Sequence, residues 1–383
     1  MSEKSGYDAV VVGGGVIGLA CAWRSAQRGA RVLVLDRARP PAGATRVAAG
    51  MLAPVGELSF GEPELLRMTL AAAELYPDFV AELEAETGIG TGYLLCGALH
   101  VALDRDEAAG LRRVHELQRS LGLGAEWLPP RRCRELEPGL TPALNGGVHA
   151  PNEGSVDPRL LTRALLAALS SEGVEVREAE VSEPLLRAER LEGVRTADGE
   201  ELWADSVVLA TGAWAGADSW LPAAARPPVR PVKGQIVELR SPDGRAPCER
   251  IVASERVYLV PREDGRLIAG ATVEERGFDT AVTAGGVHEV LREAYRLLPE
   301  VVEMELVEAM AGLRPGTPDN LPLVGPGEIE GLVLACGHYR NGILLAPHTA
   351  ETVADLLEGA HLARSSFRPD SDQKGDRVAG RSR

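Results

Sequence analysis

The sequence predicts a mixed fold, α/β together with α+β, in which a parallel-sheet domain is interleaved with an antiparallel-sheet domain. Short, fully apolar runs typical of buried parallel strands stand near the start, in the middle and near the end of the chain: 9–12, 32–35, 207–210 and 332–335. Segments that favour an antiparallel sheet follow the third of these runs: 232–239, 257–260 and 267–270. Because the parallel type stands on both sides of the antiparallel type, neither domain can be continuous in sequence.

Local signals place the other elements. Asp157 followed by Pro158 predicts a helix start, because aspartate caps free backbone N–H groups and proline suits the first helical position. An Asp-Gly pair predicts the turn of a hairpin over 193–203, and prolines over 129–142 indicate an irregular passage. We also expect helices over 19–28, beyond residue 61, over 112–121, over 287–298 and in a last segment ending near residue 358, and strands over 99–103 and 174–176.

The order of these elements gives the expected domains. The parallel-sheet domain is expected to comprise 1–90, 140–225 and 325–362, and the antiparallel-sheet domain 91–139 and 226–324. Residues 363–383 are polar, basic and poor in apolar side chains, so we expect a disordered tail there.

Composition excludes several classes of function. With 41 Lys and Arg against 56 Asp and Glu, the net charge of −15 argues against nucleic acid or an anionic membrane as the main partner. The five cysteines are scattered and form no CxxC pair, so neither a disulfide framework nor a metal site is expected. No apolar run approaches the roughly 20 residues of a membrane span, and no signal peptide is evident. We therefore expect a cytoplasmic protein without a membrane span.

The first glycine-rich turn matches the dinucleotide fingerprint GxGxxG of Rossmann-type domains. Gly13 makes the tight turn, Gly15 lets the backbone approach a pyrophosphate, and Gly18 lets the helix pack closely on the strand. Asp36 ends the next strand, where a carboxylate accepts hydrogen bonds from ribose hydroxyls. A glycine-rich turn without a ligand, and a strand-end acid without a role, are the alternatives. The fingerprint does not distinguish NAD from FAD.

A second glycine-rich segment, 43–54, follows directly. Its small residues let the backbone lie flat against a large group, and Thr45 can hydrogen-bond a phosphate. The alternative is an alanine-rich loop packed in the core. Together with the fingerprint and with the runs 312–319 (GLRPGTPD) and 337–347 (GHYRNGILLAP), this segment resembles the D-amino-acid oxidase superfamily. The resemblance extends from about residue 7 to residue 358, and within that superfamily it points to the glycine oxidase family of thiamine biosynthesis.

The resemblance implies an FAD cofactor. It would be bound non-covalently, because residues 313–316 lack the cysteine that holds flavin in some related amine oxidases. Ala44 stands where the family often has Thr or Ser, so the side-chain phosphate contact that a hydroxyl would make is not expected there. The implied FAD-binding residues are Gly13, Gly15, Val16, Ile17, Gly18, Asp36, Arg37, Ala44, Thr45, Ala49, Gly50, Met51, Val181, His338, Tyr339, Arg340, Asn341, Gly342, Ile343 and Leu344. The segment 338–344 would present a helix N-terminus to the flavin.

The resemblance also implies a substrate site. Arg314 would bind a carboxylate bidentately, as a planar guanidinium can, and Tyr258 would be a second hydrogen-bond donor. Arg340 would lie beside substrate and flavin, and Met51 would form a wall. Surface ion pairs for the arginines, and a core position for Tyr258, are the alternatives. We expect His338 to be a turn or cap residue and not a base.

The expected function is FAD-dependent oxidation of glycine, and of other small amines or D-amino acids, to an imine or 2-oxo acid, ammonia and hydrogen peroxide. The product would feed thiazole formation in thiamine biosynthesis. No general base is needed if a neutral amine is held with its Cα–H toward the flavin. A sarcosine or D-amino-acid oxidase or dehydrogenase is the nearest alternative, and an FAD-binding protein without turnover is another. The expected partners are the amine, oxygen, a thiazole synthase and further copies of the chain.

Overall fold

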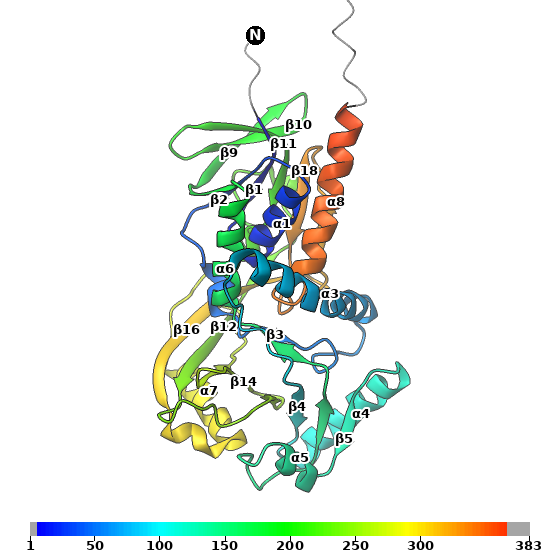
Figure 1. Ribbon diagram of the computed structural model, residues 1–383, viewed down its shortest axis with the longest axis vertical. Coiled ribbons are helices and arrows are strands. Elements are labelled where there is room, and N and C mark those ends of the chain that lie inside the picture. Colours follow the sequence, from blue (N-terminus) through cyan, green and yellow to red (C-terminus); the bar gives the residue numbers. More distant parts are fainter. Residues whose placement is uncertain (1–5, 366–383) are drawn as a thin grey trace, which may run out of the picture.

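The computed structural model describes residues 6–365, which contain two eight-stranded sheets in two regions, one above the other (Figure 1). The first sheet holds the apolar runs of the fingerprint unit, and the second holds the antiparallel segments. The two kinds of sheet alternate along the chain, which confirms the predicted fold class. The division into two domains remains our proposal.

The first sheet is mainly parallel. Its strand order is β17-β18-β11-β1-β2-β8, and the hairpin of β9 and β10 extends from β11. β1 pairs in parallel with both β2 and β11, so the first strand of the chain lies in the middle of the sheet. The bounds are β1 Tyr7–Val12, β2 Val32–Asp36, β8 Glu175–Glu178, β9 Val181–Arg187, β10 Arg190–Thr196, β11 Glu201–Leu209, β17 Leu323–Pro326 and β18 Leu332–Cys336.

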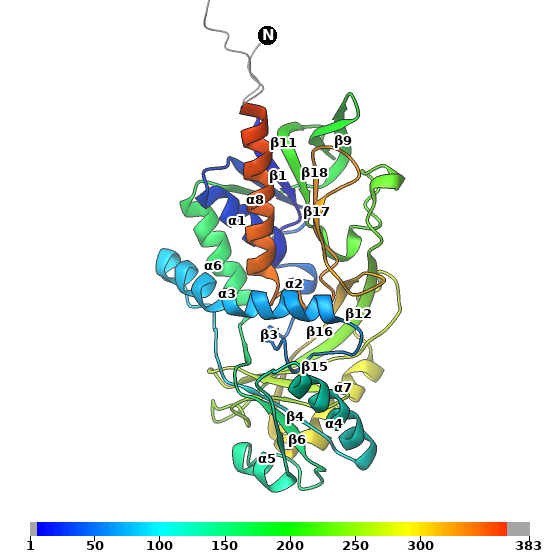
Figure 2. The same cartoon turned by 90° about the vertical axis from the view of Figure 1, so that its right-hand side faces the viewer.

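Helices cover one face of this sheet: α1 Val16–Gln27, α3 Pro63–Thr87, α6 Pro158–Ser171 and α8 Ala346–Ser365. Figure 2 shows α1, α6 and α8 side by side, with α3 lying across the lower ends of α6 and α8. Their apolar faces meet in one buried cluster, in which the ring of Trp23 packs edge-on against Phe79. A second cluster, which includes Trp220, fills the other face of the sheet.

The second sheet has the order β16-β12-β15-β14-β13-β4-β6-β5 and is antiparallel except where β4 meets β13. Its bounds are β4 Ala98–Val101, β5 Glu126–Leu128, β6 Gly147–Ala150, β12 Arg230–Arg240, β13 Ile251–Ala253, β14 Tyr258–Pro261, β15 Arg266–Gly270 and β16 Glu305–Gly316. The helices of this region are α4 Arg105–Ser120, α5 Pro130–Leu136, α7 Ala284–Leu297 and the 3-10 turn η3 Pro299–Glu303.

Short elements connect the two sheets. They are α2 Gly43–Val47, the strand pair β3 Met51–Leu52 and β7 Gly154–Ser155, and the 3-10 turns η1 Gly212–Trp214 and η2 Ala223–Ala225. The long pair β12 and β16 runs from the antiparallel sheet up to the parallel one (Figure 1). The second glycine-rich segment therefore lies between the sheets, next to the ends of β12 and β16.

Two expectations about the elements were wrong. The passage over 129–142 contains α5, because Pro130 occupies the first turn of a helix, where proline is tolerated. Helix α4 begins at Arg105 and not at residue 112, because the side chain of Asp104 caps it by accepting from the N–H groups of Asp106 and Glu107. Strand β6 belongs to the antiparallel sheet, and we therefore propose moving the domain boundary from residue 140 to a position after β6.

At the C-terminal end, α8 continues to Ser365, three residues into the segment expected to be a disordered tail. The rest of that tail lies outside the described residues. None of the helices formed by the described residues is both long and apolar enough to cross a membrane. Within residues 6–365, no group of three His, Cys, Asp or Glu side chains could hold a metal ion.

Asp157 connects the two regions. It is buried, and its Oδ1 caps α6 as expected, accepting from the N–H groups of Arg159 (2.9 Å) and Leu160 (3.3 Å). Its Oδ2 accepts from Arg266 Nη2 of β15 at 2.7 Å. Burial alone would raise the pKa of Asp157, but the hydrogen bond from Arg266 and the charge of Arg262 hold that pKa below its usual value.

We predict that Asp157→Asn lowers the free energy of unfolding by about 3 kcal/mol at pH 7, because it leaves buried arginine charge without its partner. A depressed carboxyl pKa stabilises the fold above the unfolded pKa of about 4, and this contribution is lost as pH falls through the folded value. The difference between wild type and variant, measured by urea unfolding, should therefore shrink below about pH 4. A difference that stays constant from neutral pH to pH 3 would contradict this role.

Candidate active site

A single cavity of about 1350 Å³ extends from the fingerprint turn to the strands of the antiparallel sheet. This exceeds the range of about 300–1,000 Å³ that is common for drug-sized ligands. One end is lined by the fingerprint and Asp36, and the other by Tyr258, Arg314 and Arg340. The structure thus brings both predicted sites into one space.

The fingerprint turn is packed as its glycines require. A Cβ on Gly13, whose φ is +117°, would overlap the carbonyl oxygen of Ala210, and a Cβ on Gly18 would overlap the carbonyl oxygen of Gly13. The side chain of Asp36 holds the turn, because Oδ2 accepts from the N–H of Gly14 at 2.6 Å. In the same way Thr45 Oγ1 accepts from the N–H of Val16 at 3.0 Å. A hydroxyl that accepts one bond still has its own proton to donate into the cavity.

The cavity has a wall of small residues that extends from its nucleotide end to the Arg314 end. They are Ala42, Gly43, Ala44, Ala48, Ala49, Gly50, Gly234 and Gly312. Where side chains are this small, the backbone can lie against a wide planar group over its whole length. The wall therefore fits the ring system of a flavin dinucleotide, with the fingerprint turn at the phosphate position.

Arg262 fixes this wall and was missed in the sequence. The Arg262 side chain is buried. Its Nη2 donates to the carbonyl oxygen of Ala49 at 2.5 Å, and its Nη1 donates to Ser155 Oγ at 3.3 Å. One side chain therefore positions the segment expected beside the isoalloxazine. Its only sequence signal is an arginine directly after the apolar strand β14, which is too common to identify it.

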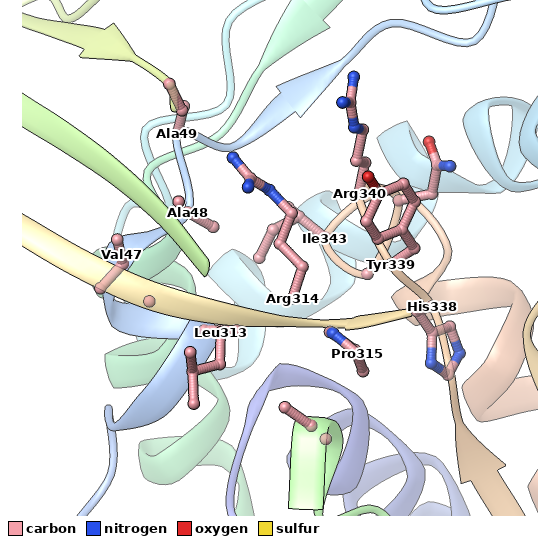
Figure 3. Close-up of a pocket in the computed structure, with 18 of the residues that line it drawn as sticks. Val47, Ala48, Ala49, Leu313, Arg314, Pro315, His338, Tyr339, Arg340 and Ile343 are labelled. Carbon is pink, nitrogen blue, oxygen red and sulfur yellow. The ribbon is translucent and has the colours of Figure 1, made fainter. Parts of the chain in front are cut away.

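Arg314 lies at the far end of the cavity, on β16 (Figure 3). Its Nη1 donates to the carbonyl oxygen of Thr272 at 3.2 Å, and a more distant bond reaches the carbonyl oxygen of Lys233 at 3.5 Å. A Cβ on Gly234 would overlap the guanidinium, so the strand next to Arg314 has room for it only because position 234 is glycine. The absence of one side chain on β12 thus determines where the positive charge lies.

Tyr258 lies close to Arg314. A Cβ on Gly270 would be only 2.6 Å from the Tyr258 hydroxyl, so a second glycine makes room for this ring. Burial raises the pKa of Tyr258, and the charge of Arg314 opposes that shift. The phenol therefore remains protonated and able to donate at neutral pH.

Arg340 provides the second cation. Burial alone would lower its pKa, but Tyr339, Glu57 and Tyr258 raise it above the ordinary arginine value. Figure 3 shows Arg340 and Arg314 extending to the same side of β16, with Tyr339 beside Arg340. Two permanent positive charges therefore face one end of the cavity.

Glu57 is the acidic residue that faces these cations, and sequence reasoning missed it. Burial raises the pKa of its carboxyl group, and the charges of Arg340 and Arg314 oppose that shift. Its loop is held because Glu153 Oε1 accepts from the N–H groups of Val55 (2.8 Å) and Gly56 (2.5 Å). Nothing in the sequence separates Glu57 from an ordinary exposed loop acid.

His338 is buried and contacts helix α8. Its Nε2 lies 2.9 Å from Thr349 Oγ1 in α8, and burial lowers the pKa of the ring to about 3. Figure 3 shows the ring turned away from Arg314 and Arg340. The imidazole is therefore neutral at physiological pH, which agrees with the expectation that it is not a base.

Three details of the expected site need correction. Gly18 does not line the cavity, because it packs against the backbone of the fingerprint turn. Leu344 does not line it either, since it is buried in the core under the helices. The segment 338–344 consists of turns, and α8 begins at Ala346, so no helix N-terminus lies within it. Every other expected cofactor or substrate residue lines the cavity, and the role of each remains a proposal.

The fold and the sequence have clear relatives. The family model described as FAD dependent oxidoreductase matches residues 8–356. The bifunctional protein ThiO/ThiG of Trichormus variabilis is 40% identical over 354 residues, which are 91% of this chain and 52% of that protein. The chain thus spans about half the length of that relative.

Two oxidases match over nearly their whole length. Glycine oxidase of Geobacillus kaustophilus is 38% identical over 358 residues, which are 92% of this chain and 93% of that protein. Its crystal structure superposes with a TM-score of 0.85 at 37% identity, covering 92% of this chain and 95% of the other. The structure of iminodiacetate oxidase from Chelativorans sp. BNC1 superposes with a TM-score of 0.84 at 28% identity, with 92% and 95% covered. The chain therefore belongs to the FAD dependent oxidoreductase family and is a flavoprotein enzyme of that family.

Proposed function

We propose that this enzyme oxidises glycine to its imine, with oxygen as electron acceptor and hydrogen peroxide as product. The observation that carries the proposal is the position of Arg314 beside Tyr258 at the antiparallel-sheet end of the FAD-sized cavity. A guanidinium and a phenol in this position suit the carboxylate of an α-amino acid. The names of the relatives, glycine oxidase and ThiO/ThiG, support the choice of substrate.

The residues at the Arg314 end of the cavity have different roles in the proposed reaction. Arg314 and Tyr258 bind the carboxylate, which fixes the orientation of the Cα–H bond. Arg340 and Met51 line the same space, and the small-residue wall receives the flavin. FAD, when bound, supplies the two-electron oxidation of the amine, and oxygen takes up those electrons. The protein contributes mainly by positioning the reactants and excluding water.

The place of the reaction in metabolism is part of the proposal. Imine formed here would feed thiazole formation in thiamine biosynthesis, with a thiazole synthase as partner, as the two-part ThiO/ThiG relatives suggest. The expected cytoplasmic location is supported by five cysteines that all have free thiols. We also propose that the enzyme assembles with further copies of itself.

A second candidate is an oxidase or dehydrogenase for sarcosine or D-amino acids. It is favoured by the continuation of the cavity past Glu57 to His100, Arg113 and Arg256, which gives space beyond the carboxylate site. The structural similarity to iminodiacetate oxidase, whose name indicates a larger amine, points the same way.

A substrate panel separates these candidates. We predict that glycine bleaches the purified yellow enzyme without oxygen and gives the highest kcat/KM for peroxide formation among glycine, sarcosine and D-alanine. Dye reduction in place of oxygen uptake would indicate a dehydrogenase. Failure of every amine in the panel to bleach the flavin would refute the proposed function.

We further predict that Gly234→Ala raises the KM for glycine about ten-fold or more, because the added methyl group displaces the guanidinium of Arg314. Arg314→Ala should raise the KM about 100-fold or more by removing charge-assisted hydrogen bonds to the carboxylate. Both variants should still purify with FAD. The matched control is Arg296→Ala, since Arg296 is an exposed arginine on α7 paired with Glu293. Unchanged KM in Arg314→Ala would remove this residue from the substrate site.

A further inference from the structure

An aromatic contact connects the two regions beside the cavity. The guanidinium of Arg37 lies over the ring of Trp214 at 4.2 Å from its centroid, and the same ring stacks with Phe278 at 5.8 Å and an interplanar angle of 25°. Arg37 follows β2 and Trp214 ends η1, both in the parallel-sheet region. Phe278 lies between β15 and α7 in the antiparallel-sheet region. We call these three side chains the cross-region stack.

The stack stands at the nucleotide end of the cavity. Both Arg37 and Trp214 line the cavity, and a Cβ on Gly43 would lie 3.7 Å from the Trp214 ring. Gly43 begins α2, the helix that carries Thr45. Asp36 and Thr45 hold the fingerprint turn, which marks the expected ribose and phosphate positions. Trp214 lines the cavity beside these positions, at the opposite end from the substrate arginines.

Two groups hold Arg37 in this position. One is the Trp214 ring, which the guanidinium contacts, and the other is the charge of the Asp218 carboxylate, which lines the cavity and acts on Arg37 without a direct ion pair. Burial raises the pKa of Asp218, while its hydrogen bond with Thr211 and the charge of Arg37 oppose that shift. The side chain of Arg37, although exposed, is thus directed toward the rim of the cavity.

Phe278 is fixed from the other side. It is 44% exposed. Its segment is anchored to Lys233 of β12 in two places: the backbones of Lys233 and Glu274 exchange two hydrogen bonds of 2.9 Å, and Lys233 Nζ lies 2.7 Å from Asp279 Oδ2. The Lys233 side chain is only 1% exposed, so this anchor belongs to the interior of the protein.

We propose that the cross-region stack clamps the nucleotide half of FAD. Trp214 forms the wall of the cavity there, Phe278 holds that ring in place from the antiparallel-sheet region, and Arg37 adds a positive charge beside the expected ribose position. The strength of FAD binding is therefore set in part by a segment that belongs to the substrate side of the protein. This proposal depends on the FAD cofactor alone and not on the choice of amine.

The test is the rate at which FAD leaves the holoenzyme after dilution, followed by the recovery of flavin fluorescence. Phe278→Ala should release FAD about five-fold faster, and Trp214→Leu about ten-fold faster, as expected for the loss of one aromatic stack and of a stack together with a cation–π contact. Phe278 acts through Trp214, so the double variant should release FAD no faster than Trp214→Leu alone. Asp279→Asn, which weakens the ion pair with Lys233, should release FAD at a rate between those of wild type and Phe278→Ala.

The matched control is Trp127→Leu. Trp127 carries the same kind of contact, with Arg112 over its ring at 3.9 Å, but it lies in β5 and does not line the cavity. It should leave the FAD release rate unchanged. Should Trp214→Leu fail to fold, Phe278→Ala alone decides the matter, since its ring is partly exposed. A release rate in Phe278→Ala within two-fold of wild type, equal acceleration in Trp127→Leu, or additive effects in the double variant would each overturn the proposal.

Discussion

The contact between Arg314 and the backbone of β12 is the constraint on which the site depends. The guanidinium can lie there only because Gly234 has no side chain, and it is fixed by the carbonyl oxygen of Thr272. A positive charge in this position must have compensating groups around it. Glu57 supplies negative charge at the same end of the cavity, Tyr258 supplies a phenol, and Arg340 adds a second positive charge, so carboxylate recognition arises from one glycine and one arginine on paired strands.

Buried polar contacts hold the two regions at the spacing that the cavity needs. Asp157 joins the start of α6 to β15, and Arg262 joins β14 to the small-residue wall. Each of these contacts is directional and places a defined group across the boundary, which apolar packing alone would do less specifically. The substrate end and the nucleotide end of the cavity share the strand β12, so a substitution at one end can alter the position of side chains at the other.

Much of the fold could be predicted because its signals are local. The apolar runs, the glycine spacing and the Asp-Pro helix start are each read within a few neighbouring residues, and they placed β1, α1, β2 and α6. The helix N-terminus expected within 338–344 came from the family resemblance, and the structure has turns there because α8 begins only at Ala346. Helix α5 was missed because proline marks both an irregular loop and the first turn of a helix. The outline of the site followed from a family resemblance in two specific segments.

The rest of the site could not be read from the sequence. Arg262 meets Ala49 across more than 200 positions (|i−j| = 213), and Trp214 stacks directly on Phe278, which belongs to the other region. No periodicity marks such partners, because their meeting depends on how two sheets pack. Glu57 has the composition of a common loop acid and becomes distinctive only when the fold buries it near two arginines.

The central claim, that Arg314 placed by Gly234 reads a carboxylate beside the flavin, is tested most directly by a ligand that cannot be oxidised as an amine. Acetate should perturb the visible absorbance of the wild-type holoenzyme in a saturable manner. Its dissociation constant should rise about ten-fold in Gly234→Ala, and the perturbation should vanish in Arg314→Ala. Equal acetate affinity in all three proteins would contradict the account.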